Sequence, residues 1–211
     1  NTLISALGLG RRWRRALEVL AALPAEALVP SAVSFNAALT ACERARHWSG
    51  AGGLLRAQRR RHILPTLVTY NAAISACERC TRWRDILELL AELPQQDLQP
   101  DLITFNAALG GTGVGLREPP SAELLLGQAA LGGLEPDAVT LNVALAACGK
   151  SLDLSLALEL SHAFGAAGLH PDALACGQLA GLCTRAGQWG RVPSCLEGAR
   201  RGGLRSLKRE R

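Results

Sequence analysis

A repeat of about 35 residues is the feature that most constrains how this chain can fold. Ten-residue segments that begin with proline line up without a gap, and the prolines are 35, 35, 36 and 35 residues apart. These prolines are Pro30, Pro65, Pro100, Pro136 and Pro171, and the tryptophans that keep the same phase are Trp13, Trp48, Trp83 and Trp189. A sequence that repeats at this period is built from stacked supersecondary units rather than from one or two ordinary domains.

Each repeat carries the pattern of two helices. In the second repeat, apolar residues recur at i, i+3, i+4 and i+7 and form one face of a helix. The stripe consists of Phe35, Ala38, Leu39 and Cys42, and it recurs as Tyr70, Ala73, Ile74 and Cys77 and as Leu141, Ala144, Leu145 and Cys148. A second helix begins near each tryptophan, as in residues 84–93. The closing proline ends one helix and suits the entry to the next.

Composition agrees with an all-helical chain, because Leu and Ala make up 74 of the 211 residues and aromatic residues only 8. One helix pair cannot bury its apolar stripes alone, so neighbouring pairs must stack. We therefore predict an all-α fold, a right-handed α-solenoid of about six helix-turn-helix repeats. The predicted units are about 1–31, 32–66, 67–101, 102–137, 138–172 and 173–207, followed by a basic tail at 208–211.

Two places depart from a regular array. Asn1 is in phase with Asn36 and the chain contains no Met, so we expect it to begin inside a repeat of a longer protein. The segment Gly110–Gly115 interrupts the first helix of the fourth unit. Each glycine there costs about 0.8–1.0 kcal/mol relative to alanine, and we expect a frayed turn.

The repeat resembles that of the pentatricopeptide repeat family in its period, its Val-Thr-Tyr-Asn-like opening and its Pro-Asp closing. The resemblance covers residues 1 to about 207. It implies a solenoid that binds single-stranded RNA and reads one base per repeat with two or three side chains. It also implies a location in a mitochondrion or chloroplast, where this family mainly works, although no targeting segment is visible in the sequence.

The same resemblance assigns a pair of base-reading residues to each repeat: the polar residue after the Thr-Tyr-like opening, and the residue after the inter-repeat proline that orients it. The pairs are Asn1 with Ser31, Asn36 with Thr66, Asn71 with Asp101, Asn106 with Asp137, and Asn142 with Asp172. Asparagine offers an acceptor and a donor, so it can match the Watson–Crick edge of a pyrimidine. In the family, Asn with Asp favours uracil, whereas Asn with Ser or Thr favours cytosine or either pyrimidine. The implied RNA site has two C/U positions followed by three U. The sixth unit has Gly177 and Leu207 at these positions, and we expect it to act as a cap.

Apolar residues precede the asparagines by three positions, at Val33, Val68, Ile103 and Val139, with Leu174 in the sixth unit. The resemblance implies that these residues sandwich the faces of the bases. The alternative is that they only pack at the start of a helix.

Basic residues follow the reading positions by eight residues, at Arg44, Arg79, Lys150 and Arg185. Eight residues is a little over two helical turns, so each cation projects near the face that carries its asparagine. We expect them to contact RNA phosphates, with gaps in the row at Leu9 and Val114. A solvated helix face is the alternative. The clusters at 11–15 and 59–62 are expected on the convex side, where they contribute solubility and loose electrostatic attraction.

No pattern in the sequence predicts catalysis, a cofactor or a metal site. Cys42, Cys77, Cys148 and Cys183 share one repeat position inside the apolar stripes, which indicates core residues. The histidines fall at unrelated repeat positions, and Cys77 and Cys80 have no second pair at ligand spacing. The longest uncharged run, 27–42, contains Pro30 and is too short to span a membrane. We therefore expect no enzyme activity in this chain, no cofactor, no membrane and no small-molecule substrate.

The function that the resemblance implies is sequence-specific binding of pyrimidine-rich, single-stranded RNA in organellar RNA processing, stabilisation or translation control. Other RNA-processing proteins are possible partners. Two alternatives stay open at this point: an α-solenoid that binds other proteins, and the RNA-recognition part of a larger RNA-processing enzyme.

Overall fold

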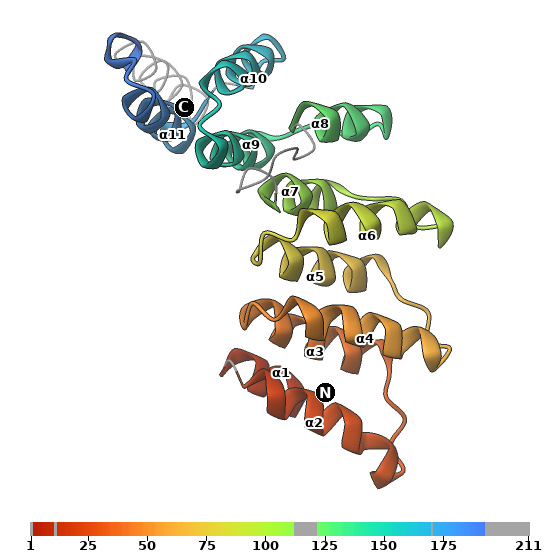
Figure 1. The fold of residues 1–211 in the computed structure, drawn as a ribbon. Coiled ribbons are helices and arrows are strands. Elements are labelled where there is room, and N and C mark those ends of the chain that lie inside the picture. The colour runs from red at the N-terminus through yellow and green to blue at the C-terminus, as the bar shows by residue number, and fades with distance from the viewer. Residues whose placement is uncertain (1, 11, 112–121, 170, 193–211) are drawn as a thin grey trace, which may run out of the picture. The chain divides into compact units, whose positions relative to one another are not determined.

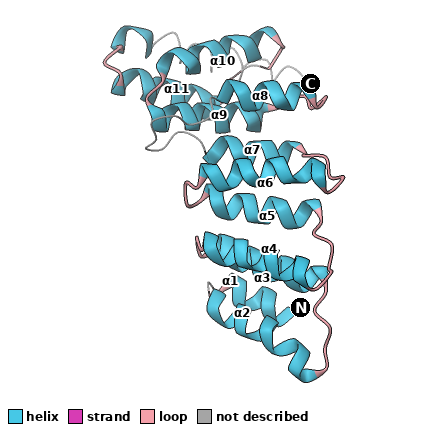
Figure 2. Cartoon of the chain, turned by 45° about the vertical axis from the view of Figure 1, so that its right-hand side comes forward, coloured by secondary structure: helices cyan, strands magenta, loops and turns pink. Residues whose placement is uncertain are grey.

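The structure is a computed structural model that describes residues 2–10, 12–111, 122–169 and 171–192. Every regular element in these residues is helical, as Figure 2 shows. The helices are α1 (Thr2–Leu9), α2 (Trp13–Ala22), α3 (Ala32–Arg44), α4 (Trp48–Arg60), α5 (Leu67–Glu78), α6 (Trp83–Gln95), α7 (Leu102–Gly111), α8 (Ala122–Leu131), α9 (Ala138–Ser151), α10 (Leu154–Ala166) and α11 (Ala173–Arg185). Two short 3-10 helices lie among the described residues, Leu23–Glu26 after α2 and Trp189–Arg191 after α11. No described helix is long and apolar enough to cross a membrane.

The chain divides into two compact units, Asn1–Gly111 and Thr112–Arg211. In the first unit the odd-numbered helices α1, α3, α5 and α7 stack in chain order, and they form one layer (Figure 1). Each of α2, α4 and α6 packs on the first helix of its own repeat and on the first helix of the next repeat. In the second unit α9 packs against both α10 and α11.

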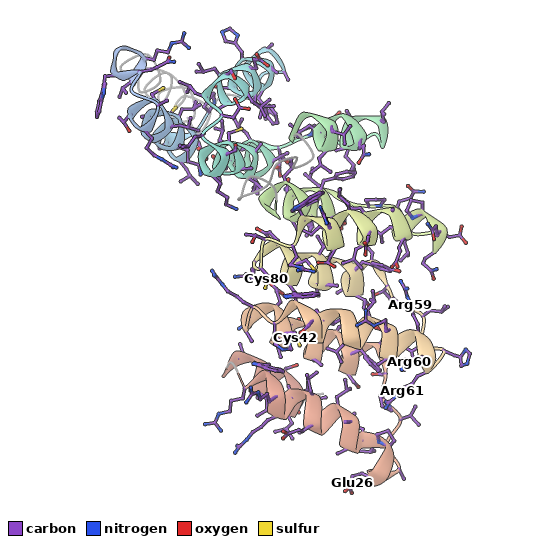
Figure 3. The ribbon with its side chains drawn as sticks, viewed as in Figure 1. Glu26, Cys42, Arg59, Arg60, Arg61 and Cys80 are labelled. Atoms are coloured by element: carbon purple, nitrogen blue, oxygen red, sulfur yellow. The ribbon has the colours of Figure 1, made fainter. Side chains whose placement is uncertain are left out.

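The predicted apolar stripes form the cores of both units. Phe35, Ala38, Leu39 and Cys42 are at most 1% exposed, and the equivalent residues of α5 and α9 are buried as well. Burial raises the pKa of the Cys42 thiol to about 11 and, with the nearby Asp85 charge, that of Cys77 to about 12. Figure 3 shows Cys42 inside the helix layers, whereas Cys80 lies in the turn after α5. The prediction that the stripe cysteines are core residues is therefore confirmed.

The residue after each inter-repeat proline begins a first helix. Ser31, Thr66 and Asp137 are N-caps whose side chains accept a hydrogen bond from the backbone N–H three residues later, and the hydroxyl of that later residue bonds back to the cap. Asp172 caps α11 in the same way but without the returning bond. Side chains at this position satisfy helical N–H groups that would otherwise have no partner. The repeated Pro-Asp or Pro-Thr sequence is thus a helix start.

The expectation of a frayed turn in the segment Gly110–Gly115 is wrong for Gly110 and Gly111, the two residues of it that the structure describes. Helix α7 continues through Gly110 and Gly111, and both residues are buried. A Cβ atom at Gly110 would overlap the side chain of Glu78, and one at Gly111 would overlap Ile86. The glycines therefore leave room for the side chains of Glu78 and Ile86 against α7, which the sequence pattern could not reveal. Residues 112–115 lie outside the described chain.

One member of the 59–62 cluster has a structural role instead of the solvated one that we expected. Arg59 Nη2 donates a 2.6 Å hydrogen bond to the hydroxyl of Tyr70, and the guanidinium also forms an ion pair with Glu92. Arg59 therefore ties α4 to α5 and α6. Arg60 and Arg61 extend beside it at the end of α4 (Figure 3) and are exposed.

Candidate nucleic-acid interface

The described asparagines of the reading positions lie in the first helices, at Asn36, Asn71, Asn106 and Asn142. All four are half-buried. Asn1 lies outside the described residues, as does Leu207 of the sixth unit. Because successive first helices stack in the first unit, Asn36, Asn71 and Asn106 recur at equivalent places along one face. We call this surface the first-helix face.

The side chain of Asn71 is held by the last residue of its own repeat and by one residue of the following repeat. Its amide Nδ2 donates to the two carboxylate oxygens of Asp101, at 3.2 and 3.4 Å. Its carbonyl Oδ1 lies 2.6 Å from the hydroxyl of Thr104, which donates to it. The same hydroxyl lies 2.7 Å from Asp101 Oδ1, and Thr104 is fully buried. Asn71 is therefore positioned by a network that also begins helix α7.

The other repeats carry parts of this network. In the second repeat the hydroxyl of Thr69 donates to Asn36 Oδ1 over 2.8 Å, and Thr66 stands where the third repeat has Asp101. In the fifth repeat Asn142 Nδ2 donates to Asp172 Oδ2 over 3.1 Å. Asn106 and Asp137 belong to different compact units. The structure thus brings the predicted pairs Asn71 with Asp101 and Asn142 with Asp172 into direct contact.

The capping aspartates are held in their charged form. Burial alone would raise the pKa of Asp101, but hydrogen bonds from Thr104 and Asn71 outweigh it, and the net shift is downward. For Asp172, the backbone N–H of Ala175 is the main cause of a lowered pKa, and the amide of Asn142 adds to it. Backbone and side-chain bonds from Thr140 lower the pKa of Asp137. Each of these aspartates is therefore an anionic acceptor at neutral pH.

The predicted base-sandwiching residues are exposed rather than packed. Their exposed fractions are 61% for Val33, 63% for Val68, 64% for Ile103, 56% for Val139 and 59% for Leu174. This exposure argues against the alternative that they only fill space at a helix start. Val68 lies three residues before Asn71 on the same helix, so the two side chains are neighbours on one face. Exposed aliphatic groups in repeat phase indicate a surface that contacts a ligand.

The predicted phosphate-binding cations lie at or just after the C-terminal ends of first helices. Arg44, Arg79, Lys150 and Arg185 are all exposed. Arg79 forms an ion pair with Glu43 of the preceding repeat, 3.2 Å between Nη2 and Oε1. Within the described residues, Arg44 and Arg185 have no ion-pair partner. A cation at this end of a helix also interacts favourably with the helix dipole, which gives these residues a second, structural reason to be basic.

Sequence reasoning missed Thr69 and Thr104 as parts of the site. Both belong to the recurring Thr-Tyr-Asn-like opening, so the repeat contained the signal, but the spacing alone did not show that their hydroxyls contact the asparagine of the preceding repeat. Among the described residues, no group of three His, Cys, Asp or Glu side chains is placed to hold a metal ion.

Comparisons with known proteins agree with the repeat architecture. A model of the pentatricopeptide repeat domain matches residues 30–79 and 53–114. No curated protein sequence matches the chain. The maize pentatricopeptide repeat protein PPR10 has a similar structure, with a TM-score of 0.77 and 22% identity, and the match covers 96% of this chain and 29% of that one.

The similar structures also include complexes with RNA. The complex of PPR10 with an 18-nt psaJ RNA element matches with a TM-score of 0.75 and 22% identity over 94% of this chain and 29% of that chain. The pentatricopeptide repeat domain of Arabidopsis thaliana protein-only RNase P 1, in complex with tRNA, matches with a TM-score of 0.61 and 17% identity over 77% of this chain and 85% of that one. These likenesses confirm the all-α solenoid fold. The chain spans less than a third of the length of the maize chain.

Proposed function

We propose that this chain, whose residues 30–114 match the pentatricopeptide repeat domain, binds single-stranded RNA along the first-helix face, with one base at each reading asparagine. The observation that carries the proposal is the arrangement around Asn71. A half-buried amide fixed by Asp101 and Thr104 lies beside the exposed side chain of Val68 on the same helix. A flat base needs both kinds of contact, since its edge carries hydrogen-bonding groups and its faces are apolar.

Aliphatic residues at the sandwiching positions suit bases of any identity, because every base has a flat face. Val68 and Ile103 belong to successive repeats, and a base at Asn71 would lie between them. Discrimination must then come from the asparagine and the residues that orient it. By resemblance to the family, the pairs Asn71 with Asp101 and Asn142 with Asp172 favour uracil, as does Asn106 with Asp137.

The expected target is therefore pyrimidine-rich, with uracil at three consecutive positions after two positions that accept either pyrimidine. The exposed Arg44, Arg79, Lys150 and Arg185 supply phosphate contacts at the opposite end of the first helices, about 12 Å along the helix from the asparagines. The ion pair with Glu43 partly neutralises the charge of Arg79, so we expect Arg79 to contribute less to RNA affinity than Arg44. Counterion release makes this part of the affinity depend on salt.

The resemblance extends the proposal to organellar RNA processing, stabilisation or translation control, in a mitochondrion or chloroplast. The chain would supply recognition there. Catalysis would come from another domain or from a recruited protein.

The test is equilibrium binding of three probes at two salt concentrations: a U-rich RNA, a purine RNA and a U-rich DNA. The proposal predicts the tightest binding for the U-rich RNA and weaker binding of every probe at higher salt. Equal affinity for all three probes would contradict the base assignments. If no probe binds, the first-helix face is more consistent with a protein-binding scaffold than with an RNA reader.

A further inference from the structure

Repeats three and five have the same pair of base-reading residues but differ at the residue that contacts the asparagine carbonyl. The residues at the positions that face Asn71 are Asp101 and Thr104. The residues at the equivalent positions for Asn142 are Asp172 and Ala175. Thr104 and Ala175 occupy the same position, three residues after the helix cap. The two repeats are therefore a matched pair within one chain.

In the third repeat both ends of the asparagine amide are fixed. The Asp101 carboxylate can only accept hydrogen bonds, so it holds the NH₂ end. The Thr104 hydroxyl, the one donor at the carbonyl end, shares its single proton between Asn71 Oδ1 at 2.6 Å and Asp101 Oδ1 at 2.7 Å. Reversing the amide would place a carbonyl oxygen against a carboxylate. The second amide hydrogen of Asn71 is then the group left for a base, and a donor there matches the O4 carbonyl of uracil.

In the fifth repeat only one end is fixed. Asn142 Nδ2 donates to Asp172, but Asn142 Oδ1 is buried and has no hydrogen-bond partner among the described residues. Ala175 is buried and carries no hydroxyl. A buried acceptor without a partner is costly, which raises the free energy of this orientation. The turned amide would place its carbonyl oxygen near the Asp172 carboxylate, as it would for Asn71 and Asp101, so the two orientations of Asn142 differ less in free energy than those of Asn71. With the amide turned, its carbonyl oxygen becomes available to a base, and an acceptor matches the N4 amino group of cytosine.

We propose that the hydroxyl at this helix position is a positioning group that sets uracil-over-cytosine discrimination by the preceding repeat, and that Ala175 makes repeat five less discriminating than repeat three. This inference rests on the RNA-binding function proposed above. It adds a third residue, supplied by the following repeat, to the pair that the family resemblance assigns. By the same geometry Thr69 positions Asn36.

Reciprocal substitutions test the inference. The measured quantity is the ratio of affinities for two RNAs that differ only by uracil or cytosine opposite one repeat. Ala175→Thr should raise this ratio at the repeat-five base about threefold to tenfold, which is the range of one net hydrogen bond. Thr104→Ala should lower the ratio at the repeat-three base by a similar factor. The ratios at all other positions should stay unchanged in both variants.

Conservative variants separate positioning from folding. Thr104→Ser keeps the hydroxyl and should keep the wild-type ratio, although Thr104 also bonds the backbone N–H of Asp101 and any replacement can lower Tm. If Ala175→Thr does not fold, Ala175→Ser supplies the hydroxyl with a smaller side chain. Ser34 shows that serine is accepted at the equivalent position of α3.

Failure of this inference can be distinguished from failure of the proposed RNA-binding function. Wild-type protein that binds RNA with equal uracil-to-cytosine ratios at repeats three and five, and a folded Ala175→Thr protein with an unchanged ratio, would overturn this inference alone. Wild-type protein that binds no RNA would overturn the proposed function and this inference with it.

Discussion

The amide of Asn71 donates to the carboxylate of Asp101, which is the residue that begins the first helix of the next repeat. One aspartate therefore serves both the local fold and the proposed ligand. It accepts the backbone N–H of Thr104 at 2.8 Å to start helix α7, and it orients the asparagine of its own repeat. This double use explains why the reading position and the helix cap recur together at one repeat period.

Changing Thr66 to Asp should give the second repeat the same arrangement. Thr66 already caps α5, and an aspartate caps a helix about equally well, so the fold should be retained. Asn36 would gain an acceptor for its amide, and the preferred base at this repeat should shift from either pyrimidine to uracil. Competition binding with uracil or cytosine at that position measures the change. An unchanged preference, with the helix cap intact, would count against orientation by the capping residue.

Acid should weaken the fold through the capping aspartates. The folded-state pKa of Asp101 lies below its ordinary value of 3.8, so the unfolded chain binds a proton first as pH falls. The stabilisation from this carboxylate is complete above about pH 5 and is lost as the pH falls below about 4. Asp101→Asn caps the helix without a titrating group. The Tm difference between wild type and Asp101→Asn should therefore narrow in acid, and a difference that does not vary with pH would exclude this role.

Arg59 should matter for stability and Arg60 should not. Arg59 bonds Tyr70 and pairs with Glu92, whereas Arg60 extends from the same helix end into solvent. Because the Arg59 side chain is partly exposed, we expect Arg59→Met to cost only about 1 kcal/mol of unfolding free energy. Arg60→Met should be within about 0.5 kcal/mol of wild type. Urea unfolding measures both, and equal effects would rule out the assigned contacts.

Val68 should affect RNA affinity rather than stability. Its side chain is 63% exposed, so Val68→Ser should change the free energy of unfolding by less than about 0.5 kcal/mol. Loss of the apolar contact to a base should weaken RNA binding several-fold. Leu131 is a matched control, since it is 90% exposed but lies at the end of a second helix. Leu131→Ser should leave RNA affinity unchanged; an equal loss in both variants would mean that Val68 has no special place in binding.

The sequence was sufficient to predict the helix pairs, because the stripes that begin at Phe35 and Tyr70 repeat in phase and each is buried as expected. It was not sufficient where the outcome depends on a neighbouring repeat. The glycine run that begins at Gly110 predicts a frayed turn, yet Gly110 is part of helix α7 and lies against the side chain of Glu78. Thr104 was visible only as part of a motif, and its bond to Asn71 crosses from one repeat to another. Local periodicity determines which residues form helices, whereas contacts between stacked helices determine which side chains are positioned for a ligand.

The most direct test of the account is to remove two reading asparagines, one at a time, and to scan base preference along the RNA. Asn71→Ala should abolish preference at one base, and Asn142→Ala at another, with a single base between them because one repeat separates Asn71 from Asn142. Preference at the remaining positions should persist in both variants. If the two variants lose preference at the same base, at every base or at none, one asparagine does not read one base and the central claim is wrong.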